Sequence, residues 1–128
     1  MVVRSSIDDK FFSVVSEGGE AVRAARLESL PVEGQIRRIF GKDAQIALAV
    51  SQAENGSRAC DRVSRPNRDG SVDIGVFQVN SNAHKAKATP DELKDCLTNI
   101  KVAKQIYDKS GWFPWVVYRT KSYLSYLK

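Results

Sequence analysis

The sequence has few of the residues that metal centres and disulfide-rich folds require. Its 128 residues include two cysteines, Cys60 and Cys96, and one histidine, His84. The cysteines lack the short Cys-x-x-Cys spacing, and a single histidine would leave a zinc site short of ligands, so we expect no metal site. The two cysteines leave two alternatives open, a disulfide across the 36-position interval or two unpaired buried thiols.

Long apolar runs are also absent. No stretch approaches the roughly 20 apolar residues that are needed to cross a bilayer, so we expect no membrane span. The first residues are interrupted by Asp8, Asp9 and Lys10 before an apolar core of signal-peptide length can form. Three alternatives follow: an export signal was removed before this sequence begins, export uses another route, or the chain acts inside the cell that makes it.

Acidic residues are in the minority, 15 against 20 lysines and arginines, and the net charge is +5. A basic surface attracts anionic partners such as nucleic acid, anionic lipid or an acidic cell-wall polymer. The cations are scattered, however, and the only local cluster, Arg62, Arg65 and Arg68, comes with no nucleic-acid-binding motif. We therefore expect no nucleic-acid partner.

The apolar pattern predicts a single domain over residues 1–128, with helices around one small β-hairpin. Residues 1–30 are predicted to be an N-terminal helical extension, with an amphipathic helix from Glu20 to Leu30. Pro31 either ends that helix or opens the next one, since proline suits the first helical turn. The fold class is α+β with helix dominant.

Within the rest of the chain, a helix is predicted from Val32 to Phe40, ended by Gly41. A second, apolar on most faces and therefore buried, follows Asp43 as N-cap and ends at Asn55-Gly56, residues that tolerate the left-handed conformation. Later helix signals are a start at residues 89–92 and a helix over residues 99–109.

The hairpin is predicted from a tight turn at residues 68–71 and the alternation that follows it. Val72, Ile74 and Val76 share one face of the expected strand, and Asp73 lies on the other.

Two carboxylates stand out in this arrangement. Glu54 falls in the last turn of the buried helix, where apolar neighbours and the negative end of the helix dipole should raise its pKa. Asp73 lies nineteen positions later in polar surroundings. Two carboxyls in such contrasting environments suit general-acid glycoside chemistry. Alone, each would more often be a solvated or ion-paired surface residue.

Three segments carry a resemblance to a known family. Residues 67–81, NRDGSVDIGVFQVNS, resemble the hairpin of the c-type lysozymes and of the related bacterial and phage lytic transglycosylases. AVSQAENGS from Ala49 is similar to the helix that ends in their catalytic glutamate, and NIKVAKQIYDKSGWFPWVVY from Asn99 is similar to their later helix and aromatic segment. The resemblance covers residues 32–120, the expected catalytic core, and implies a lysozyme-like fold whose hairpin lines the active-site cleft.

The resemblance also implies roles. Glu54 matches the general acid, and Asp73 matches the second carboxylate. Trp115 matches the aromatic residue packed against the glutamate, a known feature of lysozymes, although a core role is the plain alternative. Four residues are expected to bind substrate: Gln78, Asn80, Trp115 and Tyr118. For Tyr118 two alternatives are open, since its ring could face the glutamate or pack inside. The amides of Gln78 and Asn80 could equally serve only the turn, and His84 is expected to be a surface loop residue.

The implied activity is cleavage of the β-1,4 bond between N-acetylmuramic acid and N-acetylglucosamine in peptidoglycan, without a cofactor. The product would be that of a muramidase or of a lytic transglycosylase. Animal c-type lysozymes carry four disulfides and this chain can form one, which favours the bacterial or phage branch and slightly favours transglycosylase. Against that, lytic transglycosylases usually have serine after the glutamate, where this chain has Asn55.

The remaining expectations follow from that substrate. The protein should be a monomer whose partner is the glycan strand, acting in the cell wall or periplasm or after secretion, and a phage endolysin is one such case. A non-catalytic wall-binding or structural module on the same fold is the alternative. Such modules usually lose the carboxylates, and both Glu54 and Asp73 are present here.

Overall fold

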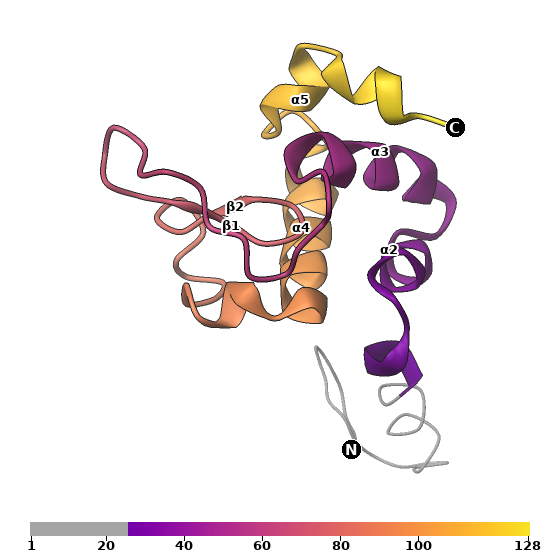
Figure 1. The fold of residues 1–128 in the computed structure, drawn as a ribbon, viewed down its shortest axis with the longest axis horizontal. Coiled ribbons are helices and arrows are strands. Elements are labelled where there is room, and N and C mark those ends of the chain that lie inside the picture. The colour runs from indigo at the N-terminus through magenta and orange to yellow at the C-terminus, as the bar shows by residue number, and fades with distance from the viewer. Residues whose placement is uncertain (1–25) are drawn as a thin grey trace. The chain divides into compact units, whose positions relative to one another are not determined.

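The computed structural model describes residues 26–128 (Figure 1). The chain separates into two compact units, Met1–Pro31 and Val32–Lys128. In the first unit, residues 26–29 are helical, and the remainder of the predicted extension lies outside the described residues. The prediction of one domain over residues 1–128 stays a prediction.

The second unit is built from helices around a small sheet, which confirms the α+β class with helix dominant. Its longer helices are α2 (Val32–Phe40), α3 (Ala44–Glu54) and α4 (Cys96–Ser110), followed by the single turn α5 (Val116–Arg119). Short 3₁₀ segments occupy Gly41–Asp43, Glu92–Lys94 and Ser122–Tyr126. The sheet has two antiparallel strands, β1 (Asp73–Ile74) and β2 (Val79–Asn80).

Helix α4 is the central element of this unit. It packs against α2 and against β2, and Figure 1 shows the small sheet on one side of α4 and α2 on the other. Helix α3 packs against α2, α5 and the last 3₁₀ segment. The buried residues of these elements form one apolar core that includes Ile36, Phe40, Phe77, Ile100 and Trp112. Burying this apolar surface is the main stabilising term for the unit.

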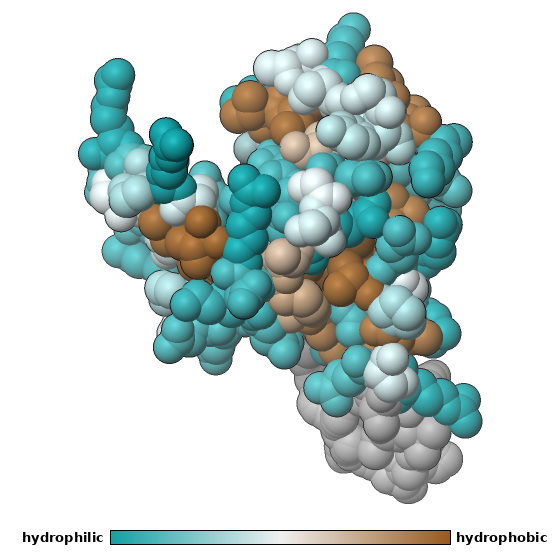
Figure 2. Space-filling view, in the orientation of Figure 1, coloured by the Kyte–Doolittle hydropathy of each residue, from teal (hydrophilic) through white to brown (hydrophobic). Residues whose placement is uncertain are grey.

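The face of the second unit that Figure 2 shows is largely polar. On the face shown in Figure 2 the hydrophobic residues lie in separate patches with hydrophilic residues between them. The exposed large hydrophobic residues among those described are Val63, Phe113, Val116, Leu124, Tyr126 and Leu127. Within residues 26–128, no helix combines the length and the apolarity that crossing a membrane requires.

Most helix boundaries agree with the sequence pattern, and the differences have local causes. Helix α2 ends at Gly41, whose φ of +54° is the left-handed conformation expected of a residue that ends a helix. Helix α3 ends at Glu54, directly before Asn55 and Gly56 as predicted. It does so without a left-handed residue at either position, because Asn55 is extended (φ −147°, ψ 95°) and the positive φ of 54° falls on Arg58. Asp43 occupies the predicted N-cap position of α3 but makes no side-chain cap hydrogen bond.

The start of α4 is also later than the Thr89 signal suggested. Thr89 and Glu92 form a reciprocal capping pair, with the Glu92 N–H donating to Thr89 Oγ1 (3.1 Å) and the Thr89 N–H donating to Glu92 Oε1 (2.8 Å). This pair caps only the 3₁₀ segment Glu92–Lys94. Helix α4 starts at Cys96, and its N-cap Asp95 accepts a hydrogen bond from the Thr98 N–H (3.0 Å).

The hairpin differs most from its prediction. The segment before it pairs irregularly with β1, since the Ser64 N–H donates to the Asp73 carbonyl (2.9 Å) and Asn67 donates to the Ser71 carbonyl (2.7 Å). The predicted turn at residues 68–71 therefore joins this segment to β1. A second turn, Gly75 to Gln78, joins β1 to β2 and ends the predicted alternation at Ile74, so Val76 belongs to a turn and not to a strand.

Candidate active site

A cleft of about 380 Å³ opens between the end of α3, the hairpin and the segment around α5. Five of the six residues predicted for catalysis and substrate binding line it, together with His84. The full lining is Glu54, Asn67, Asp73, Gln78, Val79, Asn80, His84, Ile106, Pro114, Trp115, Val116 and Val117. The fold therefore brings residues from four segments of the chain to one concave surface.

Glu54 is the last residue of α3 and is half-buried. Its pKa is raised from 4.5 to about 7. Burial is the largest cause, the charge of Asp73 also raises the pKa, and the charge of Arg62 opposes both. The sequence predicted this direction from the apolar helix. The contribution of Asp73 needed the tertiary structure, because only the fold brings the two carboxyls close enough to interact.

Asp73 is the first residue of β1 and pairs with Asn80 across the strands. The Asn80 side chain donates from Nδ2 to Asp73 Oδ1 (3.0 Å) and to Ser71 Oγ (3.0 Å). The Asp73 backbone N–H donates to Ser64 Oγ (2.9 Å). Asp73 thus lies among polar groups while Glu54 ends an apolar helix, which is the contrast that the sequence suggested.

Gln78 and Asn80 line the cleft and also serve the turns beside them. Gln78 has a positive φ of 50°, and its Nε2 donates to the Gly75 carbonyl (3.0 Å). Asn80 Oδ1 accepts the backbone N–H groups of Asn82 (3.0 Å) and Ala83 (2.8 Å). The side-chain amides of Gln78 and Asn80 therefore hydrogen-bond to backbone groups of the turns, while both residues also line the cleft.

Trp115 forms part of the cleft lining and part of the core. Its side chain is 5% exposed, and its Nε1 donates to the Phe77 carbonyl (3.0 Å) inside the hairpin turn. Tyr118, also predicted to bind substrate, is not among the lining residues. Its ring stacks on Tyr123, with 4.9 Å between the ring centroids and an interplanar angle of 19°.

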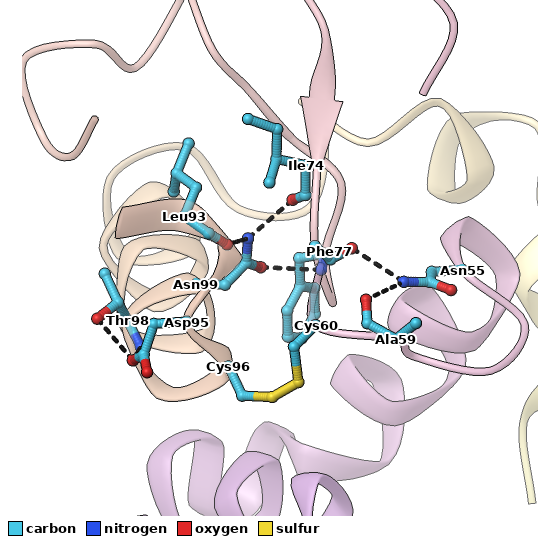
Figure 3. Close-up of a disulfide and its surroundings, with 11 residues drawn as sticks. Asn55, Ala59, Cys60, Ile74, Phe77, Leu93, Asp95, Cys96, Thr98 and Asn99 are labelled. Atoms are coloured by element: carbon cyan, nitrogen blue, oxygen red, sulfur yellow. Dashed lines mark hydrogen bonds between the residues drawn. A yellow bond between two sulfur atoms is a disulfide. The ribbon is translucent and has the colours of Figure 1, made fainter. Parts of the chain in front are cut away.

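Some residues of the site were not predicted. His84 lines the cleft, and burial and then the charge of Lys87 lower its pKa. Asn55 and Asn99 are both fully buried and hold the hairpin turn from two sides (Figure 3). An asparagine within an otherwise apolar helix stripe, as at Asn99, is the sequence signal that could have found this role.

Asn99 makes three hydrogen bonds to this region. Its Nδ2 donates to the carbonyls of Ile74 (2.8 Å) and Leu93 (2.9 Å), and its Oδ1 accepts the Phe77 N–H (2.9 Å). Gly75 lies against it with φ +79°, and a Cβ there would meet the Asn99 amide and approach the Leu93 carbonyl to 2.8 Å. Glycine is therefore required at position 75 for close packing as well as for its backbone conformation.

Cys60 and Cys96 form a disulfide, with 4.9 Å between their Cα atoms. The bond joins the loop after α3 to the first residue of α4, beside the hairpin turn (Figure 3). Across the part of the chain that the structure describes, no three His, Cys, Asp or Glu side chains gather in a way that would hold a metal ion.

Two comparisons with known proteins agree with this geometry. Residues 38–117 match the family model described as a lysozyme-like domain. A lysozyme of Galleria mellonella is 33% identical to the chain over 96 residues, which cover 66% of this chain and 79% of that protein. The matched residues include α3, the hairpin and α4, so the cleft lies within the matched region. The chain belongs to the family of lysozyme-like domains.

Proposed function

We propose that the chain cleaves peptidoglycan at the β-1,4 bond between N-acetylmuramic acid and N-acetylglucosamine, with Glu54 as the general acid. One observation carries the proposal: a carboxyl with a pKa of about 7 lies in a cleft that also holds a second carboxylate. A general acid works best when its pKa is near the working pH. Membership of the lysozyme-like family supports the same reaction class, and such an enzyme would act at the wall, in the periplasm or after secretion.

The first chemical step belongs to Glu54. Its proton moves to the glycosidic oxygen as the bond from that oxygen to the anomeric carbon breaks, and the sugar ring develops oxocarbenium character. Asp73 supplies negative charge on the same cleft wall, which stabilises the positive ring. The same charge favours the protonated form of Glu54 before the reaction, so one residue supports both requirements.

The second step determines the product. In a muramidase, Asp73 stabilises or attacks the anomeric carbon, water completes the reaction, and a reducing sugar is released. In a lytic transglycosylase, the 6-hydroxyl of the same sugar closes on the anomeric carbon, which gives a 1,6-anhydro product, and Glu54 takes up the proton of that hydroxyl. Both routes use the same general acid.

Substrate binding is assigned to the lining residues. Trp115 offers part of an aromatic ring in the cleft lining, and its indole N–H is held by the Phe77 carbonyl. Gln78 offers its side-chain amide oxygen, because its Nε2 is held by the Gly75 carbonyl. Asn80, whose Nδ2 donates to Asp73 Oδ1, acts by orienting that carboxylate. Tyr118, which is stacked on Tyr123, is proposed to act only through packing of the segment around α5.

The experiment that tests the proposal is mass spectrometry of soluble products from purified peptidoglycan. The parent protein is compared with Glu54→Gln and Asp73→Asn, and with Asp61→Asn as a control for an exposed carboxylate outside the cleft. We expect Glu54→Gln to lose activity by about 100-fold or more, the usual contribution of a general acid, and Asp61→Asn to retain it.

The products separate the two routes. Products one water lighter than reducing sugars, with activity retained in Asp73→Asn, identify a lytic transglycosylase. Reducing ends that disappear in both cleft variants identify a muramidase. A parent protein that binds walls but releases nothing from them would refute the enzymatic proposal in favour of a wall-binding module.

A further inference from the structure

The two cleft carboxyls belong to different parts of the fold. Glu54 ends α3, and Asp73 begins β1 after an intervening loop of the chain. The distance between the two carboxyls therefore depends on how the end of α3 is attached to the hairpin. The next residue after Glu54, Asn55, makes a direct connection between the two.

Asn55 is 0% exposed, and every polar group of its side chain is used. Nδ2 donates to the Ala59 carbonyl (2.8 Å) and to the Gly75 carbonyl (3.1 Å), and Oδ1 accepts from Ser57 Oγ (3.4 Å). The extended backbone at Asn55 turns the chain out of α3, and its N–H still donates to the Ser51 carbonyl (2.9 Å). The side chain is thus buried between the loop after α3 and the hairpin.

The hairpin end of this connection is held independently. The Gly75 N–H donates to the Arg62 carbonyl (2.7 Å), and Asn99 on α4 binds the neighbouring Ile74 carbonyl (2.8 Å). Gly75 lies two residues after Asp73, so its carbonyl is fixed relative to that carboxylate. Figure 3 shows Asn55 and Asn99 approaching the turn from opposite sides. A shift of the α3 end away from the hairpin must therefore break the Asn55 contact with Gly75.

We propose that Asn55 is a positioning residue that sets the separation between the Glu54 and Asp73 carboxyls. The proposal rests on the proposed function for its catalytic meaning, but its geometric content can be tested without a substrate. Because the interaction of two charges falls with their separation, loosening this connection weakens the effect of Asp73 on Glu54. It also admits water beside Glu54, so the pKa of Glu54 should fall from about 7 towards its ordinary value of 4.5.

The test is a double-mutant cycle read by NMR titration of the Glu54 side-chain carboxyl. The four proteins are the parent, Asp73→Asn, Asn55→Ala and the double variant, each as the full chain. In the parent background Asp73→Asn should lower the pKa of Glu54. In the Asn55→Ala background we expect the same change to move that pKa by about half as much or less, because coupled residues are not additive.

Two matched variants separate positioning from general loss of stability. Ser57→Ala removes only the hydrogen bond to Asn55 Oδ1. In this background, Asp73→Asn should change the pKa of Glu54 by as much as it does in the parent. Val102→Ala shortens a buried side chain of α4 and should lower stability while leaving the titration of Glu54 unchanged. If Asn55→Ala does not fold, Asn55→Ser takes its place, because a hydroxyl can reach the nearby Ala59 carbonyl but not also that of Gly75.

The outcomes are distinguishable. The proposal is overturned if Asp73→Asn changes the pKa of Glu54 by as much in the Asn55→Ala background as in the parent background. A reduced shift supports it, and the basic limb of the activity profile should then move to lower pH in Asn55→Ala, a change that reduced stability alone would not cause. If the cycle shows coupling while the parent releases no wall fragments, the positioning role stands and the proposed function fails.

Discussion

Replacing Glu54 by glutamine should stabilise the protein at alkaline pH. The reason is the raised pKa of about 7, against 4.5 for an ordinary glutamate. Between these two values the folded state holds a proton that the unfolded state releases. Folding stability therefore falls as the pH rises from about 4.5 to about 7, and above that window the folded state carries the full cost of the partly buried charge.

The magnitude follows from the shift. Each pKa unit corresponds to about 1.4 kcal/mol, so the shift corresponds to about 3 kcal/mol as an upper bound. Glu54 is only half-buried, and solvent screening reduces that figure, so we expect about 2 kcal/mol. Glutamine has nearly the same shape and no charge, so Glu54→Gln should be more stable than the parent by this amount at pH 8 and about equal to it at pH 4.

Urea unfolding followed by tryptophan fluorescence measures this directly. Both tryptophans, Trp112 and Trp115, lie in the core of the second unit, so the signal reports that unit. With an m value of about 2 kcal/mol per molar urea, the midpoint of Glu54→Gln should exceed that of the parent by about 1 M at pH 8. Asp61→Asn is the control, since it removes an exposed charge.

The reasoning would be refuted by a stability difference between parent and Glu54→Gln that is the same at pH 4 and pH 8. A parent protein more stable than the variant at pH 8 would refute it more strongly, because that sign requires a carboxylate stabilised by folding. His84, whose pKa is lowered by burial and by the charge of Lys87, is present in both proteins and contributes to both stability curves.

Three further predictions concern the surroundings of the cleft. Gly75→Ala should destabilise the protein by about 3 kcal/mol, because the residue has φ +79° and its Cβ would displace the Asn99 amide; an unchanged urea midpoint would contradict the packing argument. Replacing both Cys60 and Cys96 by serine should lower the free energy of unfolding by about 4 kcal/mol, the value of the chain-entropy model for a 36-position loop. In calorimetry, a reductant should then lower the unfolding temperature of the parent but not that of the double variant. If Glu54 is the general acid, His84→Ala should raise KM by about 2–10-fold, which corresponds to the loss of one hydrogen bond to substrate, and should leave kcat nearly unchanged. A fall in kcat of the same size would instead show that His84 takes part in the chemical step.

The helices could be predicted from the sequence because their signals are local. The apolar residues of α2 and α3 recur at helical spacing, and Gly41 and Gly111 both adopt the positive φ that suits the end of a helix. The turn chemistry was less predictable. The residues from Gly75 to Gln78 carry no tight-turn dipeptide, and their conformation depends on hydrogen bonds from distant side chains such as Asn99 and Trp115.

The sequence by itself determined the residue types of the site and their local settings. It placed Glu54 at the end of an apolar helix and Asp73 among polar residues of a hairpin, because both features depend only on neighbours along the chain. Which of the candidates face one another was decided by the tertiary structure, since long-range packing selects the face that each side chain presents. Packing placed His84 in the cleft, left Tyr118 out of it, and buried Asn55 between the two carboxylate-bearing segments.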